Sequence, residues 1–178
     1  MIEALPRQAE ERAPLILRTQ SVGLSLRPIC AEDMGFLCAL YRSTREAEIA
    51  RVQWSETQKQ SFIEMQFQAQ HSHYQAHYPN ALWLVIEARG VGAIGRLYLE
   101  RWAQEHRIID IALIPAVRGR GLGRALLEDL MDEAAAEQKA VSIHVEKENP
   151  AMRLYQRLGF RRIEDKGIYD LLRWQAKA

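Results

Sequence analysis

The segment Arg118-Gly119-Arg120-Gly121-Leu122-Gly123 is the part of the chain best suited to binding a phosphate group. Glycines let the backbone approach a ligand closely and adopt dihedral angles that other residues avoid. A helix predicted to begin directly after the segment would offer unpaired N–H groups and the positive end of its dipole. Because Arg118, Arg120 and Arg124 add positive charge, the segment predicts a site for the pyrophosphate of a nucleotide.

Two familiar phosphate motifs do not fit this segment. A Walker A loop needs a lysine and a hydroxyl residue after its last glycine, and no such pair follows Gly123. The dinucleotide fingerprint G-x-G-x-x-G needs a third glycine where Arg124 stands, and it needs an earlier place in a βαβ series. The spacing that remains is Arg118-x-x-Gly121-x-Gly123.

This spacing resembles the coenzyme A loop of the GNAT N-acetyltransferase superfamily, whose pattern is Q/R-x-x-G-x-G/A between strand four and helix three. Ile111–Pro115 precedes the loop at the family's spacing, and Asn149–Phe160 is similar to the family signature N-x-x-A-x-x-L-Y-x-x-x-G-F. Tyr155 follows Asn149 by six positions rather than seven, so the start of this helix must be shortened by one residue. The resemblance covers residues 20–175.

The resemblance implies that the chain binds acetyl-coenzyme A and transfers the acetyl group to a primary amine by direct attack, without an acyl-enzyme. It also implies that an open backbone N–H in the strand Ile111–Leu113 lies near the thioester oxygen, while the same strand pairs with the pantetheine arm. The residues implied to contact the coenzyme are Ile111, Ala112, Leu113, Arg118, Gly119, Arg120, Gly121, Leu122, Gly123, Arg124 and Asn149.

Acetyl transfer from a thioester to an amine makes three chemical demands. A lysine-like amine has a pKa near 10.4 and must lose its proton. The developing oxyanion needs a preorganised donor, and the leaving thiolate, with a reference pKa of about 8.5, benefits from a proton. Tyr155 stands where the family's general-acid tyrosine stands. The alternative for Tyr155 is core packing, because Met152 and Leu158 share its face of the helix.

The general base is less sharply indicated than the acid. In the short strand Ala140–Val145, the apolar residues Val141, Ile143 and Val145 alternate with Ser142 and His144, so His144 is expected on the face away from the core helices. His144 occupies the place where some similar family members carry a glutamate base, and an imidazole can accept a proton near neutrality. The alternatives are a surface or hydrogen-bonded histidine, with Glu146, Asp110, Glu105 or water as the base.

Composition limits the other functions that this chain could have. The 178 residues suit one domain, 48% of them are hydrophobic, and the net charge of +1 gives no basic surplus for nucleic acid or an acidic membrane. The longest apolar stretch, Ala81–Ile86, is far shorter than the roughly 20 residues that span a bilayer. The N-terminus does not resemble a secretory signal, and Cys30 and Cys38 read as free thiols, so a cytoplasmic protein is expected.

The order of predicted elements is β-α-α-β-β-β-α-β-α-β-β. We expect an α/β fold with a mixed, largely antiparallel sheet of six to seven strands, flanked by about four helices and splayed between strands four and five. Residues 1–20 are expected to be a poorly ordered extension or an extra strand, and residues 21–178 to be the acetyltransferase domain. The predicted strands span 21–27, 81–88, 91–99, 107–114, 140–145, 161–164 and 169–174. The predicted helices span 33–47, 56–71 and 121–138. A last helix is predicted to have Asn149 as its N-cap and Pro150 as its first residue, and to end at Gly159.

The acceptor cannot be identified from motifs, although in this superfamily it is chosen by the first two helices, here residues 30–80. Trp54 and Trp83 could line an acceptor site, but core packing fits them better. Arg45 and Arg51 could attract an acidic acceptor, but a solvated charge face fits them better. The cluster of His71, His73 and His77 lacks a further ligand, so no metal is expected. A sensor that binds acyl-coenzyme A without turnover and, more remotely, a nucleic-acid module are the rival functions. We expect a monomer or homodimer.

Overall fold

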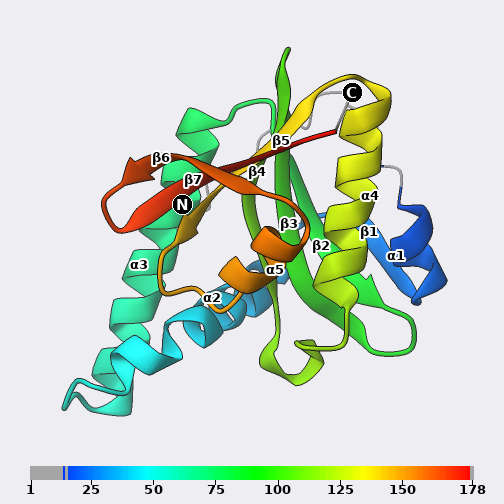
Figure 1. Ribbon diagram of the computed structural model, residues 1–178. Coiled ribbons are helices and arrows are strands. Elements are labelled where there is room, and N and C mark those ends of the chain that lie inside the picture. Colours follow the sequence, from blue (N-terminus) through cyan, green and yellow to red (C-terminus); the bar gives the residue numbers. More distant parts are fainter. Residues whose placement is uncertain (1–13, 15, 177–178) are drawn as a thin grey trace.

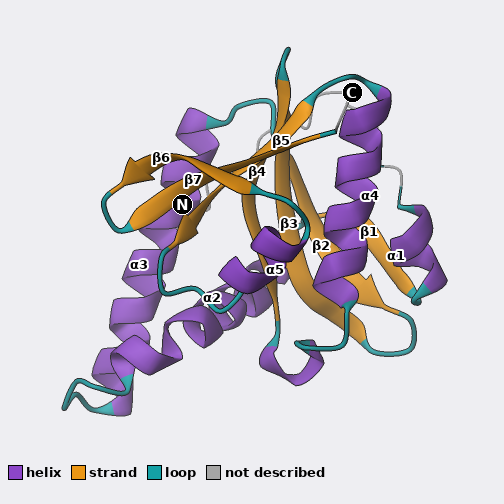
Figure 2. Ribbon diagram, in the orientation of Figure 1, coloured by secondary structure: helices purple, strands orange, loops and turns teal. Residues whose placement is uncertain are grey.

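The computed structural model describes residue 14 and residues 16–176, which form one seven-stranded sheet with helices on both faces (Figures 1 and 2). The strands lie in the order β1-β2-β3-β4-β5-β7-β6, and every neighbouring pair is antiparallel except β4 and β5. Their bounds are β1 Leu24–Pro28, β2 Leu82–Ala88, β3 Gly92–Arg101, β4 Glu105–Leu113, β5 Ala140–Glu146, β6 Arg161–Lys166 and β7 Tyr169–Gln175. This arrangement confirms the expected fold class.

The helices divide between the two faces of the sheet (Figure 1). Their bounds are α1 Leu17–Ser21, α2 Met34–Ile49, α3 Glu56–His77, α4 Leu122–Ala136 and α5 Met152–Arg157, with short 3-10 turns η1 Ala31–Asp33 and η2 Pro115–Val117. One apolar core lies between the sheet and α4 with α5, and a second lies between the sheet and α2 with α3. In β2, Leu84 belongs to the first core and Val85 to the second, which explains why this strand is an unbroken apolar run.

The strands β4 and β5 part halfway along their length. They pair in parallel only from Glu105 with Ala140 to Ile108 with Ile143. The pairing of β4 with β3 shifts at the same place, because Tyr98 faces Asp110 while its neighbour Leu99 faces Ile108, which leaves Ile109 as a bulge. Beyond the bulge, residues 110–113 of β4 pair with β3 alone, and residues 144–146 of β5 pair with β7 alone. The predicted splay is therefore present.

Several predicted element bounds were wrong by a few residues. The first strand begins at Leu24 rather than at 21, because Ser21 ends α1 and Gly23 turns the chain with a φ of 80°. Helix α3 continues to His77 rather than stopping at 71. The last helix begins at Met152, so Asn149 is not its N-cap and Pro150 is not its first residue, because both lie in the turn before it.

Most of the N-terminal extension assigned to residues 1–20 lies outside the described residues. Within the described part, residues 17–21 form α1, which lies on α4 rather than adding a strand. The buried carboxylate of Asp129 accepts hydrogen bonds from the backbone N–H groups of Arg18 at 3.0 Å and Thr19 at 2.8 Å. These bonds satisfy N–H groups at the start of α1, which has no cap of its own. None of the helices in the described part of the chain has the length and apolar character of a membrane span.

Candidate active site

The loop before α4 has the geometry of an anion site. Gly119 and Gly121 have φ angles of 74° and 80°, in the left-handed region that favours glycine, and α4 begins at Leu122. Among the described residues, no backbone carbonyl accepts a bond from the N–H groups of residues 119–124, and Ala125 is the first to bond back, to Gly121 at 3.0 Å. The loop therefore presents consecutive free N–H groups at the positive end of a 15-residue helix.

The three arginines of the loop are in different situations. The Arg118 side chain folds back, with its Nε donating to the Leu113 carbonyl at 2.8 Å and its Nη2 to Ser43 Oγ at 3.1 Å. Arg124 pairs with Glu128 in the next turn of α4 at 2.8 Å. Arg120 is exposed and pairs with no carboxylate in the described part of the chain. Of the three loop arginines, Arg120 is therefore the one whose charge is least engaged by other protein groups and most available to a bound anion.

The edge of β4 beside the splay is held close to β3 by a glycine that the sequence motifs do not include. A Cβ atom on Gly95 would lie 2.4 Å from the Ala112 carbonyl oxygen and 2.8 Å from a Leu113 methyl group, so only glycine fits there. The side chains of Ile111 and Leu113 are partly buried and pack against the first core. A lone glycine in the middle of a strand was the signal that could have revealed this close approach.

Tyr155 lies on α5 with its ring in the first core, 4% exposed and 5.4 Å from the ring of Phe160. Burial raises the pKa of its phenol, and the nearby carboxylate of Asp110 raises that pKa further, so the hydroxyl stays protonated at neutral pH. No described residue hydrogen-bonds to this hydroxyl. Core packing and proton donation are therefore compatible in the same side chain.

His144 projects from β5 on the face away from α4, as the alternation predicted, and its ring is exposed. Its Nδ1 lies 3.0 Å from Nη1 of Arg107 on β4. Because a guanidinium group only donates hydrogen bonds, Nδ1 must be the acceptor and the neutral ring carries its proton on Nε2. Partial burial and then the charge of Arg107 lower the pKa of His144, so the ring is neutral but its lone pair is occupied.

The other proposed bases also have partners. Glu105 pairs with Arg107 at 2.9 Å and accepts a bond from Ser142 at 2.6 Å. Glu146, at the end of β5, pairs with Arg45 at 2.8 Å and accepts a bond from the Tyr169 hydroxyl at 3.2 Å. Charge-assisted hydrogen bonds therefore hold both carboxylates, those of Glu105 and Glu146, in fixed positions.

Asp110 belongs to a buried polar network behind β4. The guanidinium of Arg96, 2% exposed, donates to Asp110 from Nε at 3.3 Å and from Nη2 at 2.8 Å, and Nη2 also donates to Gln70 at 3.1 Å. The Tyr74 hydroxyl reaches the same carboxylate at 3.4 Å. A buried charge needs such compensation, so the network fixes Asp110 beside the splay. Sequence reasoning missed Arg96, whose only signal is a charge within an apolar strand.

Two further contacts join the site to its neighbours. Asn149 is exposed, and its Oδ1 accepts a bond from the Ala151 N–H at 2.9 Å, which shapes the turn that starts α5 and so positions Tyr155. Helix α2 crosses the mouth of the splay, because its Ser43 meets Arg118 after β4 while its Arg45 meets the end of β5. The expectation that Arg45 is a solvated surface charge was therefore wrong.

The histidine cluster of α3 does not converge on one point. His71 is buried and stacks 5.8 Å from Phe67, whereas the rings of His73 and His77 stack on each other at 4.0 Å on the exposed side. Trp83 is buried as expected, at 2% exposure, but Trp54 is 42% exposed, so the core assignment for Trp54 was wrong.

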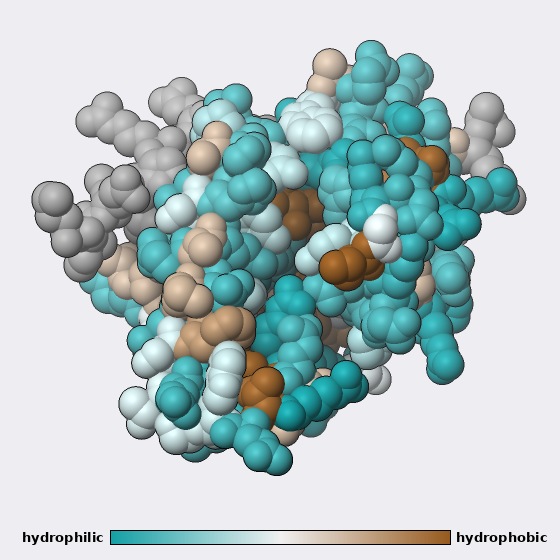
Figure 3. All heavy atoms as spheres, turned by 90° about the vertical axis from the view of Figure 1, so that its left-hand side faces the viewer, coloured by the Kyte–Doolittle hydropathy of each residue, from teal (hydrophilic) through white to brown (hydrophobic). Residues whose placement is uncertain are grey.

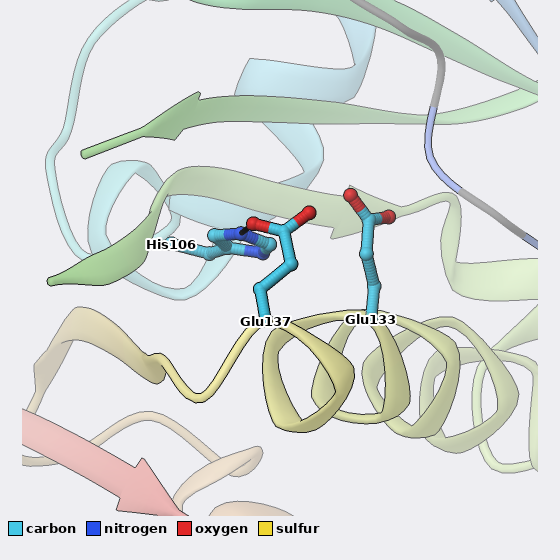
Figure 4. Close-up of side chains that lie close together, drawn as sticks. All are labelled: His106, Glu133 and Glu137. Carbon is cyan, nitrogen blue, oxygen red and sulfur yellow. Dashed lines mark hydrogen bonds and ion pairs between the residues drawn. The ribbon is translucent and has the colours of Figure 1, made fainter. Parts of the chain in front are cut away.

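A separate group of ligand-type side chains lies where β4 meets the end of α4. Figure 4 shows Glu133 of α4 and Glu137, the residue that follows α4, beside the His106 ring. Their ligand atoms all lie within 4.8 Å of one another. Arg101 pairs with Glu133 at 2.6 Å, and Lys139 pairs with Glu137 at 2.9 Å. Two cations already neutralise these carboxylates, so the group is explained as ion pairs that tie the helix to the sheet.

A splayed mixed sheet with a glycine loop of anion-site geometry at the start of α4 defines the class of the protein as a GNAT-type acyltransferase fold. A model of the acetyltransferase (GNAT) family matches residues 40–160, which is more than half of the 178 residues. The chain belongs to this family.

Solved structures agree with the fold. The PaiA N-acetyltransferase of Thermoplasma acidophilum, in complex with coenzyme A, superposes with a TM-score of 0.63 at 18% identity, over 86% of this chain and 99% of that one. An acetyltransferase from Thermus thermophilus gives a TM-score of 0.60 at 19% identity, over 86% of this chain and 97% of that one. An uncharacterised Mycobacterium leprae protein is 41% identical over 59 residues, a match that spans 33% of this chain but only 16% of that protein.

Proposed function

We propose that the chain transfers an acetyl group from acetyl-coenzyme A to the primary amine of an acceptor by direct nucleophilic attack. The observation that carries the proposal is the buried ring of Tyr155, which belongs to the same core as Ile111 and Leu113 of the splayed edge of β4. The splay leaves residues 109–113 without a neighbouring strand on one side. The PaiA N-acetyltransferase, which has a similar fold, was solved in complex with coenzyme A.

The coenzyme is proposed to lie along the edge of β4 and to end at the loop. The backbone N–H groups of residues 119–124 would hold the pyrophosphate, with Arg120 the cation most ready to assist. The Arg118 guanidinium can contact the phosphates only after its hydrogen bond to the Leu113 carbonyl breaks. The proposed contact residues are Ile111, Ala112, Leu113, Arg118, Gly119, Arg120, Gly121, Leu122, Gly123, Arg124 and Asn149.

In the proposed reaction the amine nitrogen forms a bond to the thioester carbonyl carbon, and the carbon–sulfur bond then breaks. A backbone N–H of Ile111–Leu113 stabilises the negative oxygen of the tetrahedral intermediate. Tyr155 gives its proton to the leaving thiolate and takes one back from solvent between turnovers. The amine loses its own proton to a base or to water, so charge and protons balance.

His144 remains the proposed base, with one condition that the geometry imposes. While Nδ1 accepts a bond from Arg107, the Nε2 atom already carries a proton and cannot take another. His144 can act only after Arg107 moves or the ring turns. Water, Glu146, Asp110 and Glu105 are the remaining candidates, and each of these carboxylates would have to give up an existing partner.

The test is release of thiol from acetyl-coenzyme A in the presence of a panel of primary amines, beside calorimetric binding of coenzyme A and of DNA. We expect amine-dependent thiol release with an acetylated product visible by mass spectrometry, and no DNA binding. Coenzyme A binding without release for any amine would support the rival function, a sensor in which Tyr155 is purely structural. The cytoplasmic location, the monomeric or homodimeric state and the absence of a metal or a membrane partner remain predictions.

A further inference from the structure

A cavity of about 360 Å³ lies between α2 and α3, at the corner where the two helices join. Most of its wall is apolar or aromatic, and these wall residues are Tyr41, Ile49, Val52, Trp54, Phe62 and Ile63. In Figure 3 the lower end of the molecule shows a few hydrophobic residues among hydrophilic ones. The Trp54 ring packs edge-on against Phe62 at 5.2 Å and stays 42% exposed, so a large aromatic surface is left facing the cavity and solvent.

The cavity is joined to the proposed reaction cleft through one side chain. Arg45 lines the cavity, and its guanidinium pairs with Glu146 at the end of β5 at 2.8 Å. Glu146 also meets the hydroxyl of Tyr169 on β7 at 3.2 Å. Since β5 is one wall of the splay, Arg45 connects the lining of the cavity directly to that wall.

The charges at the inner end favour a cation over an anion. Among the described residues that line the cavity, Arg45 is the only positive group, and it is already paired with two carboxylates, Glu48 at 2.8 Å and Glu146 at 2.8 Å. A ligand carboxylate would therefore find no unpaired cation, while an ammonium group would meet an excess of negative charge. A mainly apolar cavity with a few charged groups is the usual character of a site for a small organic molecule.

We propose that this cavity holds the body of the acceptor, and that the acceptor is an amine carried on an aromatic or branched aliphatic group without a neighbouring carboxylate. The assignment rests on the proposed acetyl transfer, since it names the substrate class of that reaction. Trp54 and Phe62 would contact the apolar body, while the amine would extend past Arg45 toward the splay.

The experiment compares three amines as acceptors: phenethylamine, phenylalanine and propylamine. For the wild-type chain, kcat/KM should be highest for phenethylamine, by on the order of tenfold over propylamine, because ring burial removes apolar surface from water. Phenylalanine should be the poorer aromatic substrate because its carboxylate meets Glu48 and Glu146. Equal kcat/KM for all three amines would overturn the proposal while leaving acetyl transfer intact.

Two variants test the cavity by opposite changes. Trp54→Ala removes the aromatic wall and Val52→Phe fills the space, so both should lower the ratio of phenethylamine to propylamine kcat/KM by about tenfold. Met65→Ala is the matched control, because Met65 is an apolar side chain of α3 that is 59% exposed and does not line the cavity. This control should keep the wild-type ratio, and circular dichroism melting should show that all three variants fold.

Binding measured without turnover separates the two proposals. Calorimetry should show phenethylamine binding to the wild-type chain and weaker binding to Trp54→Ala, whether or not any amine is acetylated. No turnover with such binding would overturn the proposed reaction and retain the cavity as an amine site. Turnover with no difference between the wild type and either cavity variant would overturn the cavity assignment and retain the reaction.

Discussion

Replacing Tyr155 by phenylalanine separates the acid role of this residue from its packing role. The ring and its contact with Phe160 at 5.4 Å are kept, and the lost hydroxyl has no partner among the described residues. The free energy of unfolding should therefore change by about 1 kcal/mol or less. The affinity for coenzyme A should stay within about twofold, since the proposed phosphate site is the loop before α4.

The loss of rate in Tyr155→Phe can be bounded by the chemistry of the leaving group. General acid catalysis contributes about 10²- to 10⁴-fold, and a thiolate of reference pKa about 8.5 leaves without a proton more readily than an alkoxide does. We therefore expect the low end, a fall in kcat of about 100-fold, which corresponds to about 2.7 kcal/mol of barrier. The measurements are kcat with a saturating amine, the coenzyme A dissociation constant and urea unfolding.

The pH dependence of kcat is a second test of the acid role of Tyr155. Burial and the Asp110 carboxylate raise the pKa of Tyr155 above its ordinary value near 10, so the protonated, proton-donating form persists across the neutral and mildly alkaline range. Ionisation of Tyr155 should therefore cause no fall in kcat below about pH 10. A kcat within threefold of wild type in Tyr155→Phe, or a parallel loss of coenzyme affinity, would refute the acid role.

Three further changes test the remaining parts of the site. Gly121→Val forces a β-branched residue into a φ of 80°, so calorimetry should show at least about tenfold weaker coenzyme A binding, and unchanged affinity would remove the loop assignment. Arg107→Gln removes a positive charge that lowers the pKa of His144, so the pKa of His144 should rise, which NMR titration of the ring can measure. If His144 is the general base, the acid limb of the kcat/KM profile should move to higher pH. A rise in the pKa of His144 without movement of that limb would exclude His144 as the base. Gly95→Ala places a Cβ within 2.4 Å of the Ala112 oxygen, so urea unfolding should show a loss of about 1–3 kcal/mol, and wild-type stability would contradict the close approach.

Local signals were enough to predict the conformation of the glycine loop and the elements on either side of it. The glycine spacing at 119–123 marks a backbone that must enter the left-handed region, and the observed φ angles of Gly119 and Gly121 agree with that reading. Alternation in β5 placed His144 on the face away from the core, because side chains of a strand alternate regardless of its neighbours. The boundaries of α5 and α3 were wrong because capping and packing, rather than periodicity, set where a helix ends.

Only the tertiary structure decided which side chains are free to react. The sequence shows His144, Asp110 and Glu146 as possible bases, but it does not show that Arg107, Arg96 and Arg45 hold them. These partners come from other strands and helices, so strand register and helix packing choose them. A charged side chain reveals its type in the sequence, whereas its pKa and its available lone pairs depend on what the fold brings within about 4 Å. For the same reason, the cavity at Trp54 exists only because α2 and α3 pack at their shared corner.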